Sequence, residues 1–204
     1  MAVEIFIARH GQNEDNANGI LNGHRDLPLT ELGREQARQL GEGIKELGMK
    51  FDVIYCSPLS RAKETAEIVS TILGIAQAPT VIRELIERDF GVMTGKPQED
   101  IAVLCAPDII TAPPVTYFLC PEGAETFPQL VERGHKALEI VRAMQKSGNA
   151  LLVCHGDLGK MIYAAATEKD WRDVLVGFHF GNGELIEITP KDDARVIEVP
   201  QHNS

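Results

Sequence analysis

At 204 residues, the chain has the length of one ordinary domain and can bury a core without disulfides or metals. Its 44% hydrophobic and 25% charged residues are typical of a soluble globular protein and exclude a disordered or membrane-embedded chain. The net charge of −10 argues against a surface for nucleic acids or anionic membranes, because nothing would offset phosphate repulsion overall. A local basic pocket is still compatible with this charge.

The first third of the chain predicts alternating strands and helices. Residues 3–8 (VEIFIA) are short, β-branched and aromatic, which predicts a buried first strand. Residues 30–48 then predict a helix, because apolar residues recur at helical spacing between a capping Thr30 and a terminal Gly48. Residues 51–55 (FDVIY) predict the second strand.

The next helix places an arginine close to the end of that second strand. Ser57 is expected to cap this helix and Pro58 to occupy its first position, with Gly74 at its end. Arg61 therefore falls in the first helical turn.

The second half continues the alternation after a less regular stretch. Apolar residues between 127 and 141 predict a long helix that opens after Thr126, and residues 150–154 (ALLVC) predict a third core strand. A further helix starts at about Asp157. Residues 184–188 and 195–199 predict final strands, joined by a turn at 190–193.

This order of elements predicts a single α/β domain over residues 1–204. We expect a three-layer sandwich, with a mostly parallel central sheet flanked by helices on both faces. Residues 97–132 contain many prolines and neither lysine nor arginine. We expect this stretch to form an irregular insertion over one end of the sheet, with residues 97–125 acting as a substrate lid.

Basic side chains follow the ends of the three strongest strands. The first strand is followed by Arg9-His10-Gly11, the second by Arg61, and the third by His155-Gly156. Ligands of open α/β sheets gather at the carboxyl ends of the strands, where helix N-termini also point. We therefore expect these groups to meet at one edge, where an anion would offset the cost of clustering their charges.

Phosphate is the anion that suits this cluster. Arginine forks match phosphate oxygens, and a glycine after each histidine lets the backbone approach the ligand closely. A histidine among arginines favours its neutral form, which leaves a ring nitrogen able to attack phosphorus. The leaving oxygen needs a proton donor, and Glu84 and Glu87 are both candidates that spacing alone does not separate.

At this point the sequence resembles the histidine phosphatase superfamily, also called phosphoglycerate-mutase-like. Its Arg-His-Gly signature stands at residues 9–11. The similarity continues in order through GHRDLPLTELGREQARQLG (23–41), CSPLSRAKETA (56–66), ERDFGVMTGK (87–96), PEGAETF (121–127) and VCHGDLGKMI (153–162). The tripeptide alone is common, whereas the ordered set is specific and spans most of the chain.

The resemblance implies a role for each matching residue. His10 would be the nucleophile that becomes phosphohistidine, and Glu87, rather than Glu84, the general acid and base. The implied phosphoryl-binding and substrate-binding residues are Arg9, Arg61, His155, Asn16, Gly156, Gly23 and Arg88. His155 counts among the catalytic groups. The family pattern is not matched everywhere, since Asn13 and Asp15 replace a hydroxyl residue and an aromatic residue beside the signature.

The implied reaction is phosphomonoester hydrolysis of a small phosphorylated metabolite without metal or cofactor. Mutases of the family carry extra basic residues after the catalytic acid, and residues 97–132 contain none. This difference favours a phosphatase whose leaving group carries little extra negative charge or has an apolar part. A phosphoglycerate mutase and a sugar-bisphosphatase are the alternatives within the family.

Three alternatives lie outside this mechanism. A cysteine phosphatase would pair Cys56 with Arg61, but only four residues separate them where its phosphate loop needs five. A metal hydrolase would draw on histidines that share no short ligand spacing, namely His10, His24, His135, His155 and His179. A binding module without catalysis is the third, although the complete set of expected catalytic residues argues against it.

The N-terminal residues and the cysteines predict a cytoplasmic protein. The first five residues lack the basic region and long apolar core of a signal peptide. The cysteines form no CxxC pair, so reduced thiols are expected at Cys56, Cys105, Cys120 and Cys154. We expect a small phosphorylated substrate, neither nucleic acid nor membrane as partner, and a homodimer as the default assembly.

Overall fold

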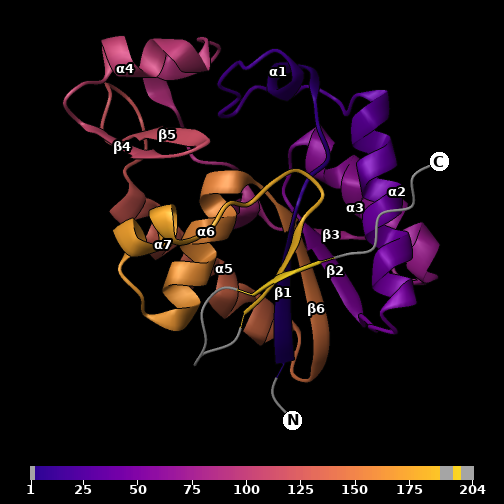
Figure 1. The fold of residues 1–204 in the computed structure, drawn as a ribbon. Helices are drawn as coiled ribbons and strands as arrows, with labels where there is room; N and C mark the ends of the chain where they lie inside the picture. The colour runs from indigo at the N-terminus through magenta and orange to yellow at the C-terminus, as the bar shows by residue number, and fades with distance from the viewer. Residues whose placement is uncertain (1–2, 189–194, 199–204) are drawn as a thin grey trace.

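The computed structural model describes residues 3–188 and 195–198 and contains a six-stranded central sheet. The strand order is β3-β2-β6-β1-β7-β8 (Figure 1). The strands are β1 (Val3–Arg9), β2 (Val53–Cys56), β3 (Thr80–Val81), β6 (Gly148–Cys154), β7 (Leu185–Glu187) and β8 (Arg195–Ile197). The first four strands in that order are parallel, whereas β7 and β8 each run antiparallel to the preceding strand. The predicted strands are therefore present, and the predicted turn at 190–193 lies outside the described residues.

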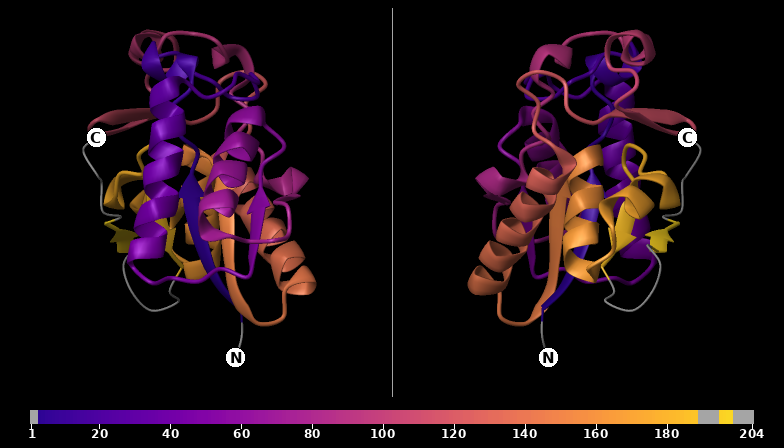
Figure 2. Two further views of the ribbon diagram at one scale, coloured as in Figure 1. Left: turned by 90° about the vertical axis from the view of Figure 1, so that its right-hand side faces the viewer. Right: turned by 90° about the vertical axis from the view of Figure 1, so that its left-hand side faces the viewer.

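Helices cover both faces of this sheet (Figure 2). One face carries α2 (Glu31–Glu46) and α3 (Ser60–Leu73), and the other carries α5 (Phe127–Met144) and α6 (Gly156–Thr167). The shorter α7 (Trp171–Gly177) packs beside α6. This arrangement confirms the predicted three-layer α/β domain. None of the described helices is long and apolar enough to cross a membrane.

Strand alternation divides the apolar side chains between the two faces. In β6, Leu151 and Val153 pack with α2 and α3, whereas Leu152 and Cys154 pack with α5 and α6. These four residues are completely buried. A strand covered on both sides must be apolar at every position, which explains the unbroken run ALLVC.

The helix starts agree with the sequence at two positions and differ at a third. Thr30 accepts a hydrogen bond from the backbone N–H of the third helical residue, as predicted, and Thr126 caps the helix that was predicted to open after it in the same way. The prediction that Ser57 caps α3 is wrong, because the helix begins at Ser60 with Leu59 at the N-cap. Ser57 instead accepts from the Leu59 N–H and pairs with His155. Arg61 still lies in the first turn.

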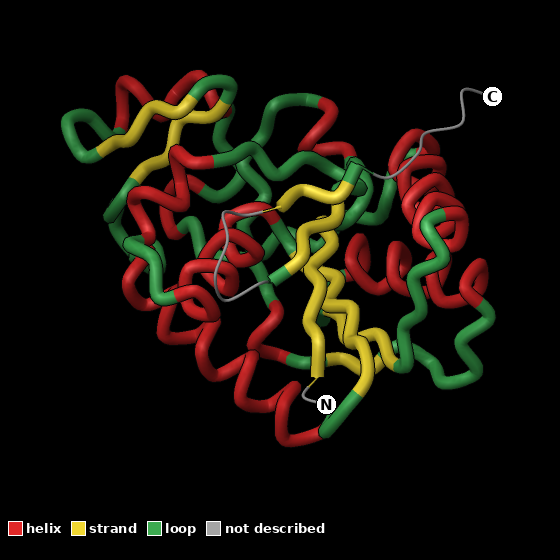
Figure 3. Tube along the Cα trace, turned by 60° about the horizontal axis from the view of Figure 1, so that its bottom comes forward, coloured by secondary structure: helices red, strands yellow, loops and turns green. Residues whose placement is uncertain are grey.

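The segment expected to be irregular contains regular structure. It comprises η3 (Gln98–Asp100), α4 (Ile101–Leu104) and a hairpin of β4 (Ile109–Ala112) and β5 (Val115–Phe118). The tube in Figure 3 shows this hairpin apart from the main sheet. The remaining short elements are α1 (Glu14–Ala17), η1 (Arg83–Leu85) and η2 (Gly91–Met93). A separate small core of Leu21, Phe90, Met93, Ile101 and Phe118 joins this segment to the loops above the sheet.

Candidate active site

The sheet register brings the three strand ends together. Arg9 pairs with Cys154 in the register of β1 and β6, and the His10 N–H donates to the Cys154 carbonyl at 3.0 Å. The Ser57 N–H donates to the Val153 carbonyl at 3.1 Å, which places the end of β2 on the other side of β6. The rings of His10 and His155 consequently lie edge to face with centroids 5.0 Å apart.

Hydrogen bonds define the tautomer of His10. Its Nδ1 lies 2.6 Å from the Gly11 carbonyl, which only accepts, so Nδ1 carries the proton. Its Nε2 accepts from Arg61 Nε at 3.1 Å, and because a guanidinium only donates, this nitrogen must hold a lone pair. The unprotonated Nε2 is therefore the nitrogen with nucleophilic capacity.

Burial and positive neighbours keep both histidines neutral. Burial lowers the pKa of His10 well below its ordinary value, and the charges of Arg61 and Arg9 lower it further. The same causes lower the pKa of His155, whose Nε2 lies 2.7 Å from Ser57 Oγ. Among the described residues, His155 Nδ1 is a buried nitrogen without a hydrogen-bond partner.

The two arginines are positioned by backbone carbonyls rather than by carboxylates. Arg61 donates through Nη1 to the Arg25 carbonyl at 2.7 Å and through Nη2 to the Gly23 carbonyl at 3.1 Å. Arg9 donates to the Phe180 carbonyl at 2.6 Å. Burial lowers the pKa of Arg61 to about 10. Both side chains nevertheless stay cationic near neutral pH, and among the described residues no carboxylate forms an ion pair with either of them.

Glu87 faces this cluster from the loop after η1 and is 6% exposed. Its Oε1 accepts from the backbone N–H of Arg88 at 2.8 Å and from that of Leu158, in the first turn of α6, at 3.1 Å. Burial raises the pKa of Glu87 and the nearby Asp157 charge raises it further, whereas the two backbone donors and Arg61 oppose these effects. The net effect is a pKa above the ordinary value of a glutamate.

Arg88 is a buried partner of Asp157. Its Nε donates to Asp157 Oδ2 at 2.9 Å and its Nη1 to the Phe118 carbonyl at 3.0 Å. Its guanidinium stacks on the rings of Phe118 and Phe127, 4.2 and 4.3 Å from their centroids. The side chain lines the cavity, which is where the family resemblance would place it. Its guanidinium is, however, already paired with Asp157 and hydrogen-bonded to the backbone.

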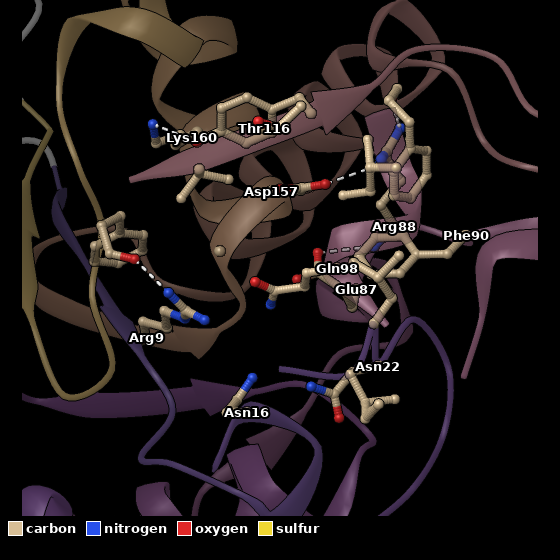
Figure 4. A pocket seen from close by; sticks show the side chains of 18 of the residues that line it. Arg9, Asn16, Asn22, Glu87, Arg88, Phe90, Gln98, Thr116, Asp157 and Lys160 are labelled. Atoms are coloured by element: carbon tan, nitrogen blue, oxygen red, sulfur yellow. Dashed lines mark hydrogen bonds and ion pairs between the residues drawn. The ribbon is translucent and has the colours of Figure 1, made fainter. Parts of the chain in front are cut away.

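The cluster opens into a cavity of about 320 Å³, which is large enough for a small ligand. Of the residues predicted from the sequence, those that line it are Arg9, His10, Asn16, Arg61, Glu87, Arg88 and Gly156. Figure 4 shows Arg9, Asn16 and Glu87 around one space. His155 is absent from that lining and its ring lies edge to face with that of His10, and the described lining does not include Gly23 either.

Gly23 and Gly11 are required by backbone conformation and backbone packing rather than by contact with a ligand. Gly23 has φ +48° and offers its carbonyl to Arg61, and a Cβ there would lie 2.9 Å from Thr94 Oγ1. A Cβ on Gly11 would lie only 2.1 Å from the Gly33 carbonyl oxygen in α2. The prediction that Gly11 clears space for a ligand is therefore wrong, because the close neighbour is another backbone.

We predict that Gly11→Ala destabilises the fold. The added methyl overlaps backbone atoms that cannot rotate away, so about 2 kcal/mol or more of unfolding free energy should be lost. Thermal melts followed by circular dichroism should show a midpoint lower by about 5 °C or more. Gly177→Ala is the matched control, since a Cβ there meets nothing within 4 Å. Equal midpoints for the two variants would contradict the close approach.

Several residues around the site were not predicted from the sequence. Ser57 pairs with His155, Asp157 with Arg88, and Asn182 Nδ2 donates to the His10 carbonyl at 2.9 Å. Lys160 is buried and contacts the Tyr117 hydroxyl at 2.9 Å. Asp157 and Lys160 lie at the start of α6, directly after His155-Gly156, and this position next to the motif was the available signal.

Two of the alternative chemistries find little support in this geometry. Cys56 is absent from the described cavity lining, and burial raises the pKa of its thiol to about 11, which disfavours a thiolate nucleophile. Within residues 3–188 and 195–198, no three or more His, Cys, Asp or Glu side chains are grouped so that they could hold a metal ion.

Comparison with known proteins gives a family match over most of the chain. The model of the histidine phosphatase superfamily, branch 1, matches residues 5–202. A Parvibaculum lavamentivorans protein named 2,3-bisphosphoglycerate-dependent phosphoglycerate mutase is 35% identical over 156 residues, which are 75% of this chain and 74% of the relative.

Solved structures share the fold over almost the whole chain. An Escherichia coli protein described as a candidate alpha-ribazole-5'-P phosphatase has a TM-score of 0.75 and 26% identity, covering 97% of this chain and 96% of that chain. A mycobacterial glucosyl-3-phosphoglycerate phosphatase has a TM-score of 0.77 and 22% identity, covering 98% and 99%. The named relatives thus include both mutases and phosphatases.

Proposed function

The chain belongs to the histidine phosphatase superfamily, and from this membership we propose that it is a metal-independent phosphomonoesterase acting on a small phosphorylated metabolite. The observation that carries the proposal is the neutral His10, whose lone pair on Nε2 lies in a cavity together with Arg61 and Glu87, a carboxyl group whose pKa is raised by burial. These are the three groups that phosphoryl transfer to a histidine requires: a nucleophile, a charge clamp and an acid.

In the first step, His10 Nε2 attacks phosphorus and the bond from phosphorus to the leaving oxygen breaks. Arg61 Nε, which now donates to that nitrogen at 3.1 Å, turns to a phosphoryl oxygen and frees the lone pair. Glu87 gives its proton to the leaving oxygen, so that an alcohol departs. Nδ1 keeps its proton and donates it to the Gly11 carbonyl, and this hydrogen bond stabilises the positive charge that the phosphorylated ring acquires.

In the second step, a water molecule attacks phosphorus and the nitrogen–phosphorus bond breaks. Glu87, now a carboxylate, takes the water proton and is restored to its acid form. His10 leaves as a neutral ring, which is the form favoured by burial and by the two neighbouring arginines. Inorganic phosphate is the second product.

The remaining polar groups would hold the phosphoryl oxygens. Arg9, Asn16 and the start of α6 at Gly156 line the cavity beside His10, and a helix N-terminus favours an anion. The positive charge of Arg9 and Arg61 takes the part that metal ions play in kinases. His155 would join them through its unpartnered Nδ1: Ser57 Oγ already accepts from the Leu59 N–H, so its hydroxyl can donate to His155 Nε2 and leave Nδ1–H as a donor.

A phosphoglycerate mutase is the second candidate, because the curated relatives at up to 35% identity carry that name. A mutase must bind a second anionic group while it transfers the first. The other arginine and lysine of the described cavity lining, Arg88 and Lys160, are engaged by protein atoms, which favours the phosphatase.

The experiment that tests the proposed function compares two reactions in the presence of EDTA. The enzyme should release phosphate from p-nitrophenyl phosphate and should interconvert 2- and 3-phosphoglycerate slowly, with or without 2,3-bisphosphoglycerate. Rapid interconversion would make the chain a mutase, and loss of phosphate release that zinc restores would favour a metal hydrolase. A lack of any turnover would leave the binding module.

We predict that Asp157→Asn shifts the pH profile of kcat/KM to lower pH for benzyl phosphate, whose alcohol leaving group needs a proton. The first step needs protonated Glu87, so kcat/KM falls as pH rises through the pKa of that carboxyl. The Asp157 charge raises this pKa. Removing the charge lowers the pKa of Glu87 and shifts the alkaline limb of the profile to lower pH. The unpaired Arg88 charge acts in the same direction.

The matched control for this shift is Asp173→Asn, which removes an exposed acid from the first turn of α7, away from the cavity. Its alkaline limb should coincide with that of the wild type. Ionisation of the substrate phosphate affects all variants equally and cancels in the comparison. An unchanged limb in Asp157→Asn, with activity lost at every pH, would mean that Asp157 supports the structure without tuning Glu87.

A further inference from the structure

The cavity has two chemically different walls. The strand ends supply a positive wall, with Arg9, Asn16 and Arg61 around His10. A second part of the described lining, here called the outer wall, comprises Ile20 from the loop after α1, Gln98 and Glu99 of η3, Ile101 and residues 114–116 at the start of β5. In Figure 4, Thr116 lies across the cavity from Asn16. A phosphate on His10 would direct the rest of its substrate towards this outer wall.

The outer wall presents apolar surface and uncharged polar groups. Ile20, Ile101, Pro114 and Val115 supply the apolar part. The Gln98 amide and the Thr116 hydroxyl can form hydrogen bonds without adding charge. The carboxylates at this side of the cavity belong to Glu99, which is exposed, and to Asp157. The local charge is therefore neutral to negative.

Lys160 has no free donor for a ligand, because its three ammonium protons are directed at neutral protein oxygens. They point to the Tyr117 hydroxyl at 2.9 Å, the Leu175 carbonyl at 2.8 Å and the Phe178 carbonyl. Burial also lowers the pKa of Lys160 to about 8. The lysine joins α6 to the end of α7 and to β5.

The Arg88 guanidinium is likewise bound by protein atoms. Its ion pair with Asp157 and its hydrogen bond to the Phe118 carbonyl hold the guanidinium between aromatic rings. Moving it towards a ligand would leave the Asp157 carboxylate without its 2.9 Å partner. Among the described residues that line the cavity, no arginine or lysine is thus available to a second anionic group once a phosphate occupies Arg9 and Arg61. His179 also lines the cavity, and burial lowers its pKa, which favours the neutral imidazole.

We propose that the outer wall is a leaving-group subsite for uncharged alcohols with an apolar body, and that it rejects substrates carrying a second phosphate or a carboxylate there. This inference rests on the proposed function, because it assigns the substrate class of the same site. Gln98 and Thr116 would hold hydroxyl groups of the alcohol, and the isoleucine and hairpin surface would cover its carbon skeleton.

The test compares benzyl phosphate with 4-carboxybenzyl phosphate. The two esters have the same primary leaving oxygen and differ in one remote carboxylate, so their ratio of kcat/KM reports the outer wall rather than the chemistry. We expect benzyl phosphate to be preferred by about tenfold or more, because the carboxylate meets like charge and finds no cation. A ratio near one, or a preference for the carboxylate, would overturn the inference.

A charge substitution in the wall gives an independent gain of function. Gln98→Lys places a cation at η3, on an exposed residue that lines the cavity, and should reduce the preference for benzyl phosphate by about tenfold. Gln77→Lys makes the same change on an exposed residue outside the described cavity lining and should keep the wild-type ratio. An identical response of both variants would show that net charge, not the wall, sets the preference.

These outcomes separate the inference from the proposed function. If neither ester nor p-nitrophenyl phosphate is hydrolysed, the proposed phosphatase is wrong. If both esters are hydrolysed equally well, the phosphatase stands and the outer wall does not select for charge. Only hydrolysis with the predicted ratio, and its reduction in Gln98→Lys alone, supports the subsite.

Discussion

His10→Ala is expected to abolish phosphatase activity, with kcat reduced about 10⁴-fold or more, towards the background rate. The loss follows from the two-step mechanism, because every turnover passes through a bond between phosphorus and His10 Nε2. His155 cannot replace it, since its ring is completely buried and absent from the described cavity lining, and its Nε2 contacts Ser57. The arginines would still hold the phosphoryl group, but no nucleophile would reach it.

The measurement combines turnover with detection of the intermediate. Phosphate release from p-nitrophenyl phosphate gives kcat, and rapid quenching in alkali followed by mass spectrometry should find one phosphoryl group on the wild type and none on His10→Ala. His135→Ala, which removes an exposed imidazole from α5, is the control and should retain both. Stabilisation of His10→Ala by inorganic phosphate in thermal melts would show that the folded site is intact.

The opposite result would be equally informative. If His10→Ala kept substantial turnover without forming a phosphoenzyme, water would attack the substrate directly. The two histidines would then be binding groups, and the mechanism proposed from the His10 tautomer would be wrong.

The convergence of the site could be predicted because sheet topology determines it. In a parallel sheet, consecutive βα units end at one edge, so residues 9, 10 and 155 had to meet once residues 3–8 and 150–154 were interpreted as strands. Arg61 followed from its place in the first turn of α3, even though the predicted cap at Ser57 was wrong. The periodicity of apolar residues within each segment was enough to identify these strands and this helix.

Residues that act through distant neighbours could not be predicted in the same way. The partner of Asp157 is 69 positions away at Arg88, and Gly11 is required by a helix that crosses it at Gly33. The segment 97–125 lacked clear periodicity because its hairpin and short helix pack on a core of only a few side chains, outside the main sheet. Selection of Glu87 over Glu84 came from the family resemblance rather than from spacing.

Glu87→Gln should reduce kcat/KM for benzyl phosphate by about 10²- to 10⁴-fold, because an alkoxide is a poor leaving group without a proton. The amide keeps an oxygen that can accept from the backbone N–H groups of Arg88 and Leu158, so the loop should hold its shape. The loss should be much smaller for the first step with p-nitrophenyl phosphate, since nitrophenolate departs as a stable anion. This difference between the two esters identifies an acid.

The second step gives the same variant a distinct kinetic signature. Without the Glu87 carboxylate, no base activates the water, so the phosphohistidine should accumulate and p-nitrophenol should appear as a burst followed by slow turnover. Glu84→Gln is the matched control, because that residue lies outside the described lining of the catalytic cavity and only its backbone carbonyl contacts Arg133. A burst in Glu84→Gln instead of Glu87→Gln would move the acid to Glu84. Equal losses for both esters, without a burst, would mean that Glu87 serves to bind the substrate and transfers no proton.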